Sequence, residues 1–81
     1  MYDIIFTEKV ERELGKLEKS IQERIFAVLE RVKIRPESYF QRLVGEKAYK
    51  LRIGDHRVIA DILDDKIIIL NVGHRRNVYD F

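Results

Sequence analysis

The chain has 81 residues, a formal net charge of +2, 46% hydrophobic and 37% charged residues, and no cysteine. This length predicts one domain over residues 1–81, and the composition is typical of a folded chain rather than a disordered one. Disulfides and thiolate chemistry are excluded, two histidines argue against a His/Cys metal site, and no apolar run approaches the ~20 residues of a membrane span. We therefore expect a cytoplasmic protein that carries no metal and no other cofactor.

The first half of the chain predicts one strand and a pair of helices. Residues 2–6, YDIIF, are apolar, β-branched and aromatic, which favours a short strand. Thr7 is placed to cap the helix that follows, and apolar residues then recur with helical spacing up to about residue 34. Residues 20–23, SIQE, have the form of a capping box, and Pro36 predicts that the second helix ends before it. Residues 8–34 therefore read as a helical hairpin whose apolar stripe covers a sheet.

The second half predicts a connection and three strands. In the connection, residues 37–46, we expect Leu43 and Val44 to pack under the sheet. The strands are expected at residues 47–53, 56–63 and 66–73, with Gly-Asp and Asp-Asp in the two turns. The last strand, KIIILNV, is apolar on both faces, which is typical of a central strand.

These elements give an α+β fold in the order β-α-α-β-β-β. The N-terminal strand and the helical hairpin are expected to pack on one face of a mainly antiparallel four-stranded sheet. Helices on one side leave the other face of the sheet open, so the strand parities decide which side chains are exposed there.

A cluster of cations falls on the face predicted to be open. A two-residue loop at Gly54-Asp55 places Arg52 directly opposite Arg57, and Lys50 shares their parity. Like charges directly opposite each other destabilise a sheet. A solvated face is the simpler interpretation for Lys50, but the arginine pair has no structural advantage and favours a function. Cations beside aromatic side chains suit RNA, which offers phosphates and unstacked bases.

A second cluster, VGHRRNVY at residues 72–79, follows the last predicted strand. It contains His74, a residue type that exchanges protons near neutral pH, together with Arg75 and Tyr79. A capping histidine and a docking tyrosine are the alternative interpretations. Lysine, arginine, histidine and tyrosine together suit cleavage of RNA by its own 2′-hydroxyl, which needs a proton acceptor, cations on the phosphorane and a donor for the leaving 5′-oxygen.

Residues 42–79 resemble the RelE toxins of the RelE/ParE toxin–antitoxin superfamily. The matching segments are LVG at 43–45, YKLRIGDHRV at 49–58 and VGHRRNVY at 72–79. The resemblance implies an mRNA interferase: an endoribonuclease hydrolase that binds mRNA in the ribosomal A site, cleaves the codon there without metal and inhibits translation. It also implies a RelB-like antitoxin partner, a toxin–antitoxin complex that binds operator DNA through the antitoxin, and no membrane partner.

The same resemblance implies roles for individual residues. Lys50 and Arg52 match the two basic residues of the second sheet strand, the latter cast as proton acceptor or phosphate stabiliser. Arg57 matches the arginine on the scissile phosphate. Arg75 matches the arginine assigned to transition-state stabilisation or leaving-group protonation, and Tyr79 matches the tyrosine that stacks on the base.

Two features of this sequence modify those roles. Arg52 stands where the best-studied members carry lysine, and arginine is a poor base because its pKa lies above ~12. Either Lys50 takes the proton or catalysis is mainly electrostatic. We also hypothesise that His74, beside Arg75, donates the proton to the leaving group. Two alternative functions stay open: a ParE-like toxin that inhibits DNA gyrase, and a non-catalytic RNA-binding member of the fold.

Overall fold

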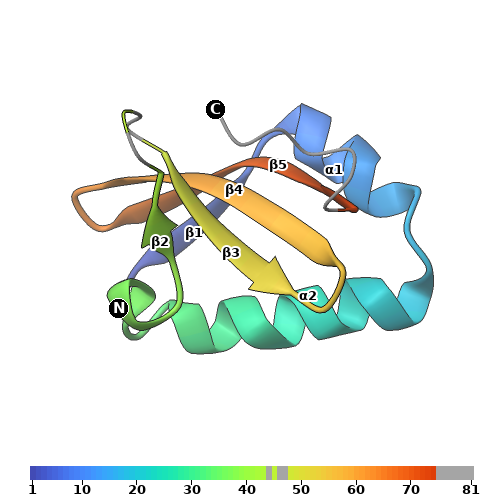
Figure 1. The fold of residues 1–81 in the computed structure, drawn as a ribbon, viewed down its shortest axis with the longest axis horizontal. Helices are drawn as coiled ribbons and strands as arrows, with labels where there is room; N and C mark the ends of the chain where they lie inside the picture. Colours follow the sequence, from blue (N-terminus) through green and yellow to red (C-terminus); the bar gives the residue numbers. More distant parts are fainter. Residues whose placement is uncertain (44, 46–47, 75–81) are drawn as a thin grey trace.

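The chain forms two layers, a twisted sheet and a helical layer, in the computed structural model, which describes residues 1–43, 45 and 48–74 (Figure 1). The elements are β1 (Asp3–Phe6), α1 (Glu8–Gly15), α2 (Lys19–Val32), the short 3-10 helix η1 (Pro36–Ser38), β2 (Gln41–Arg42), β3 (Tyr49–Ile53), β4 (His56–Leu63) and β5 (Lys66–His74). The predicted helical hairpin and the three long strands are confirmed, and their bounds differ from the predicted ones by a few residues at most.

The sheet has five strands in the order β1-β5-β4-β3-β2. β1 pairs with β5 in parallel, and the other neighbours are antiparallel, so the apolar strand β5 is central as predicted. The predicted α+β class is confirmed. The fifth strand, β2, was not predicted because two residues are too few to show an alternation of polar and apolar side chains.

The first helix begins as predicted. The Thr7 side-chain oxygen accepts a hydrogen bond from the backbone N–H of Val10 at 3.2 Å, so Thr7 is the N-cap of α1. This cap satisfies one of the backbone N–H groups that the first turn of a helix leaves without a partner. The strand β1 therefore turns directly into α1 with no intervening loop.

The second helix begins differently from the prediction. Its first residue is Lys19 and its N-cap is Glu18, which makes no side-chain capping bond, so the capping box at Ser20 is wrong. Ser20 lies inside the first turn instead. The side chain of Gln22 donates to the carbonyl oxygen of Leu14 in the last turn of α1, at 2.7 Å, and to that of Leu17 in the connection after it, at 3.0 Å. These two bonds hold the helices together. Neither helix in the described ranges has the length and apolar character that a membrane crossing requires.

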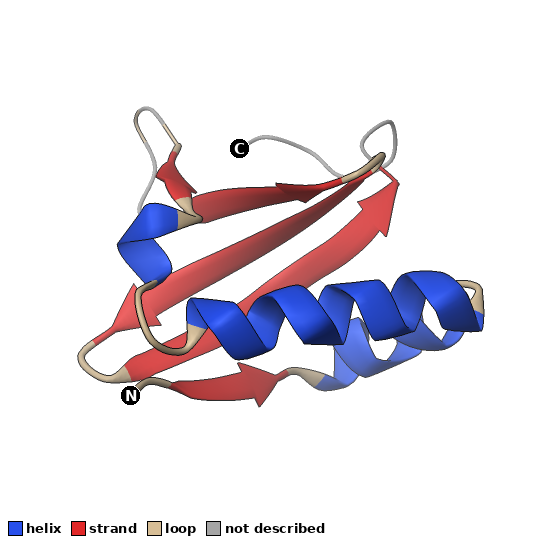
Figure 2. Cartoon of the chain, turned by 90° about the horizontal axis from the view of Figure 1, so that it is seen from below, coloured by secondary structure: helices blue, strands red, loops and turns tan. Residues whose placement is uncertain are grey.

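Both helices cover the same face of the sheet (Figure 2). Residues of α1, α2, β3, β4 and β5 form one buried cluster there, which includes Val10, Leu14, Ile25, Leu29, Leu51, Val58, Ala60, Ile67, Ile69 and Val72. Because side chains alternate along a strand, the neighbours of Leu51 and Val58 project from the other face, here called the open face. A small second cluster of Leu43, Ala48 and Ile59, with Leu70 packed against it, lies there. Leu43 is thus buried as predicted, while Val44 lies outside the described residues.

One irregularity changes the alternation of β5. Ile59 pairs with Asn71, but the next residue, Ala60, pairs with Ile69, so Leu70 is an extra residue in β5. Such a β-bulge reverses the parity of the residues that follow it. Ile67 and Ile69 before the bulge and Val72 after it therefore all pack against the helices.

Candidate functional site

The cationic pair lies where the sequence predicts it. In the β3–β4 hairpin Ile53 pairs with His56 and Arg52 pairs with Arg57. Gly54 has φ 60°, the conformation that the first residue of a type II′ turn requires and that glycine adopts without strain. The two-residue turn sets this register, so the turn itself places two guanidinium groups side by side on the open face.

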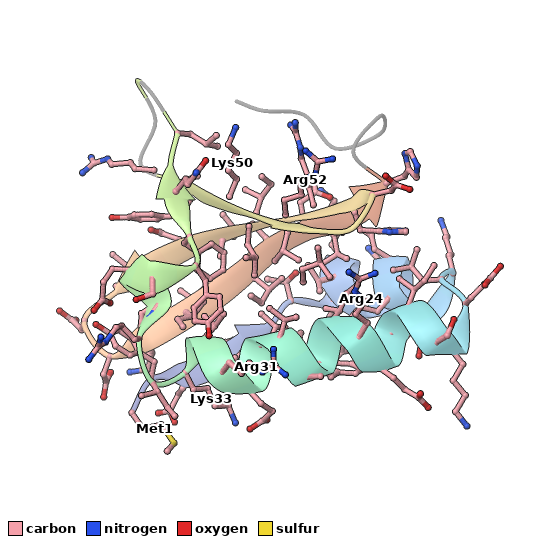
Figure 3. The ribbon with its side chains drawn as sticks, turned by 60° about the horizontal axis from the view of Figure 1, so that its bottom comes forward. Met1, Arg24, Arg31, Lys33, Lys50 and Arg52 are labelled. Carbon is pink, nitrogen blue, oxygen red and sulfur yellow. The ribbon has the colours of Figure 1, made fainter. Side chains whose placement is uncertain are left out.

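A local hydrogen bond orients one of the two arginines. The Nε of Arg52 donates to the carbonyl oxygen of Gly54 at 3.1 Å. This bond uses one of the five guanidinium N–H groups and leaves the terminal amino groups for a ligand. Figure 3 shows Arg52 and Lys50 pointing away from the helical layer, on the same side of the sheet.

These cations line a hollow of about 350 Å³ at the border between the open face and the β3 edge. Its lining is Tyr39, Gln41, Lys50, Leu51, Arg52 and Arg57. β2 pairs only with Tyr49 and Lys50, so the rest of β3 has no described strand on this side. The hollow is therefore bounded by the sheet edge, by an aromatic ring and by three cationic side chains.

The electrostatic character of the hollow follows from its lining. Lys50, Arg52 and Arg57 carry positive charge, and none of the described residues that line it is a carboxylate. Arg57 is half-buried and Arg52 is exposed, so the hollow is open to solvent and to a ligand of substantial size. Charge of one sign around a concave surface attracts counter-charged ligands, and arginine binds phosphate oxygens in bidentate geometry.

Two residues of this lining add functional groups that the strand pattern did not predict. Gln41 belongs to the short strand β2 and pairs with Lys50. The sequence did not predict Gln41 as a site residue because it did not predict the strand β2. Tyr39 follows η1 and lines the hollow beside the cations. An amide and a tyrosine ring beside three cations complete the chemistry with which proteins bind single-stranded nucleic acid.

His74 lies on the other face. It pairs with His56, and their rings are 5.6 Å apart between centroids. His56 pairs with Ile53 on one side and stands two residues from Val58, and both apolar residues belong to the cluster under the helices. Strand alternation therefore puts the two histidines on the helix side and the arginine pair on the open side. By this alternation the position of His74 and the arginine pair belong to opposite faces of the sheet.

The remaining predicted site residues, Arg75 and Tyr79, lie outside the described residues. The strand that precedes them is placed, because Gly73 pairs with Arg57. The last described part of β5 is also fastened from outside the sheet: the Glu13 Oε1 of α1 accepts from the backbone N–H of Val72 at 2.9 Å. Among residues 1–43, 45 and 48–74, no group of three or more His, Cys, Asp or Glu side chains is arranged to hold a metal ion.

Comparison with known proteins relates the chain to toxins of type II toxin–antitoxin systems. The family model described as the ParE toxin of the type II toxin–antitoxin system parDE matches residues 4–79. Among solved structures, the RelBE2 toxin–antitoxin complex of Mycobacterium tuberculosis has a TM-score of 0.79 at 29% identity and covers 91% of this chain and 98% of that chain. No curated protein matches the chain significantly.

Two further structures share the fold at lower identity. The intact Escherichia coli RelBE complex matches with a TM-score of 0.79 and 23% identity, over 91% of this chain and 96% of that chain. The archaeal RelE–RelB complex of Pyrococcus horikoshii matches with a TM-score of 0.76 and 24% identity, over 95% of this chain and 98% of that chain.

Proposed function

The chain belongs to the ParE toxin family of type II toxin–antitoxin systems, within the RelE/ParE superfamily, and from that membership we propose that it is a ribosome-dependent mRNA endoribonuclease. In this proposal the protein enters the ribosomal A site in the cytoplasm, cleaves the codon there and stops translation. The single observation that carries the proposal is the Arg52–Arg57 pair with Lys50 in one hollow of the open face.

The arginine pair supports a phosphate ligand for an energetic reason. Two like charges on directly opposite residues destabilise a sheet, by roughly 0.2–1 kcal/mol. A bound phosphodiester reverses the sign of this interaction, because each guanidinium then faces an anionic oxygen. The gain is larger still when the phosphorane forms, since the transition state carries more negative charge than the substrate.

The proposed reaction is an intramolecular transesterification at one phosphodiester of the RNA. The 2′-oxygen of the ribose attacks the adjacent phosphorus, the bond from phosphorus to the 5′-oxygen breaks, and a 2′,3′-cyclic phosphate remains. Only a neutral amine can accept a proton, so the proposed acceptor of the 2′-OH proton is the deprotonated form of Lys50, which becomes an ammonium in the step, because the guanidinium of Arg52 is too weak a base. Arg52 and Arg57 stabilise the charge on the non-bridging oxygens. The nucleophile belongs to the substrate, so the step requires no metal-bound water.

The group that protonates the leaving 5′-oxygen must lie on the same face of the sheet as the scissile phosphate, which is the open face in this proposal. This requirement disfavours His74, whose position in β5 shares the alternation of Val72 on the helix side of the sheet. By resemblance the role falls to Arg75, and the stacking of the base falls to Tyr79. Both roles stay proposals, because these residues lie outside the described part of the chain.

The proposed partner is a RelB-like antitoxin. The matched structures of M. tuberculosis and P. horikoshii are complexes of a toxin with such an antitoxin. A cationic hollow without carboxylates in its described lining suits an acidic partner segment, which would inhibit by covering Arg52 and Arg57. The complex is proposed to bind operator DNA through the antitoxin rather than through this chain.

Toeprinting on programmed ribosomes with an empty A site tests the proposal, with EDTA-treated wild-type protein and the variants Arg57→Ala and Lys50→Ala. We expect cleavage within the A-site codon by the wild type and a loss of about 10²–10³-fold in rate for Arg57→Ala, the cost of removing one transition-state donor. The matched control is Arg12→Ala, which removes an exposed arginine of α1. A folded wild type that does not cleave would refute the proposal.

A second candidate function rests on the matched family model, which describes ParE toxins. By the resemblance, ParE-like toxins inhibit DNA gyrase and lack the cationic set of the open face, which this chain has. A gyrase supercoiling assay with the wild type and Arg57→Ala separates the two functions: inhibition that persists in the variant favours a ParE-like toxin. Absence of both activities favours the third reading, a non-catalytic RNA-binding protein.

A further inference from the structure

A second hollow lies next to the cationic one. It has a volume of about 360 Å³ and is lined by Arg31, Ile34, Arg35, Ser38 and Tyr39, at the junction between the end of α2 and η1. Tyr39 lines both hollows, so its side chain separates them. Arg31, Arg35 and Ser38 do not line the first hollow.

The lining of this second hollow has the chemistry of a nucleotide subsite. Arg31 and Arg35 are exposed guanidinium groups, the Ser38 hydroxyl is a further donor, and the described lining contains no carboxylate. Tyr39 is 38% exposed and Ile34 is 70% exposed, so apolar surface is available for a base. Arginines that track phosphates beside an aromatic ring on which a base stacks are the common elements of single-stranded RNA binding.

The arrangement also gives a route between the two hollows. The first hollow is lined by residues of both β2 and β3, and Tyr39 lines it together with the second hollow. Figure 3 shows Lys50 and Arg52 on the open side of the sheet and Arg31 on α2, on the helix side. An RNA strand seated between Arg52 and Arg57 would therefore have to pass Tyr39 to reach Arg31.

We propose that the mRNA strand continues from the Arg52–Arg57 hollow across Tyr39 into the second hollow, where Arg31 and Arg35 bind the phosphate of a neighbouring nucleotide and Tyr39 stacks on a base. This inference rests on the proposed function, because it extends the same RNA beyond the cleavage position. It assigns the second hollow to single-stranded RNA rather than to a protein segment, since two cations, a hydroxyl and a shared aromatic ring match a polyanion continuous with the first hollow.

The test is RNA binding without the ribosome and without cleavage. A fluorescein-labelled single-stranded RNA of about twelve nucleotides with 2′-O-methyl groups cannot undergo attack by its own 2′-oxygen, so anisotropy measures binding alone. For single strands, log K against log salt falls with a slope of about −0.7 per neutralised phosphate. The Arg31→Ala/Arg35→Ala double variant should flatten this slope by about 0.7, because one phosphate contact is lost, and Arg57→Ala should flatten it by up to about 0.7.

Three further variants sharpen the measurement. Tyr39→Ala should weaken binding by about tenfold or more at fixed salt through the loss of one stacked base, whereas Tyr39→Phe should retain it. The control for charge, Arg12→Ala/Lys19→Ala, removes two exposed cations from α1 and the start of α2 and should leave the slope unchanged.

The outcomes separate this inference from the proposed function. A slope unchanged in Arg31→Ala/Arg35→Ala but reduced in Arg57→Ala would overturn the second subsite and mark that hollow as a surface for a protein partner. Equal losses in the control double variant would overturn it too, because binding would then follow net charge. A wild type without salt-dependent RNA binding would also overturn it, whereas the proposed cleavage is decided by the toeprint alone.

Discussion

The hydrogen bond between Glu13 and β5 has a measurable effect on the end of the sheet. The Glu13 carboxylate accepts from the backbone N–H of Val72 at 2.9 Å. β1 pairs with β5 only as far as Ile69, so no β1 residue is available to accept from Val72. We expect Glu13→Ala to leave this N–H without its acceptor and to destabilise the fold.

The magnitude follows from the charge and burial of the bond. A hydrogen bond to a charged group contributes about 1.5–3 kcal/mol, and an unsatisfied donor costs about 1–3 kcal/mol. The Glu13 side chain is 24% exposed, so water partly replaces the carboxylate and the lower part of this range applies, about 1–2 kcal/mol. For a domain of this size that corresponds to a fall in Tm of about 5–10 °C.

Thermal unfolding and amide hydrogen exchange check this expectation. The amide of Val72 should exchange about tenfold faster in Glu13→Ala, because 1.4 kcal/mol corresponds to a factor of ten. Glu13→Gln keeps an acceptor oxygen and should lose less than half as much. Lys9→Ala is the matched control, since its 4.0 Å ion pair with Glu13 is exposed and contributes little. A Glu13→Ala protein as stable as Lys9→Ala, with unchanged exchange at Val72, would refute the reasoning.

Three further predictions concern the hairpin and the last strand. Gly54→Ala should lower the free energy of unfolding by about 1 kcal/mol or more, because φ at Gly54 is 60°. The control Gly15→Ala has nothing within 4 Å of the added Cβ and should leave that free energy equal or higher. Urea unfolding of both variants measures the difference. His74→Ala should cleave mRNA at the wild-type rate across pH 6–8 in the toeprint, and a rate that falls would restore the histidine as proton donor. The free energy of unfolding of Arg52→Gln minus that of the wild type should be a few tenths of a kcal/mol larger at low salt than in 1 M NaCl, because salt screens the repulsion between Arg52 and Arg57 that the variant removes. An equal difference at both salt concentrations would contradict this.

The register of the cationic pair was predictable because it depends on local chemistry alone. A two-residue turn with glycine first allows one pairing of the flanking strands, and that pairing fixes Arg52 against Arg57. The same holds for the Thr7 cap, where a hydroxyl precedes an amphipathic run. In both places the residues that determine the structure lie within a few positions of one another.

The features that were missed depend on contacts between distant segments. The Gln22 side chain caps α1 only because the helical hairpin folds back on itself, so the SIQE pattern pointed to the wrong bond. The face of His74 depends on the bulge at Leu70, and the residues before it, IIIL at 67–70, are all apolar, so no alternation of polar and apolar residues reveals the extra residue. Gln41 lines the hollow from a strand of two residues, which is too short for an alternation of polar and apolar side chains to be recognised.

The bulge in β5 also determines which face of the sheet each of the residues 71–74 points to. Residues 71–74 have their inward and outward positions exchanged relative to a strand without the bulge: Val72 faces the helices, and Gly73, opposite Arg57, faces the open side. Removal of one residue at this point would invert that assignment without touching the β3–β4 hairpin. A single-codon insertion or deletion in this strand is therefore enough for evolution to move residues 71–74 between the two faces of the sheet while the arginine pair stays in place.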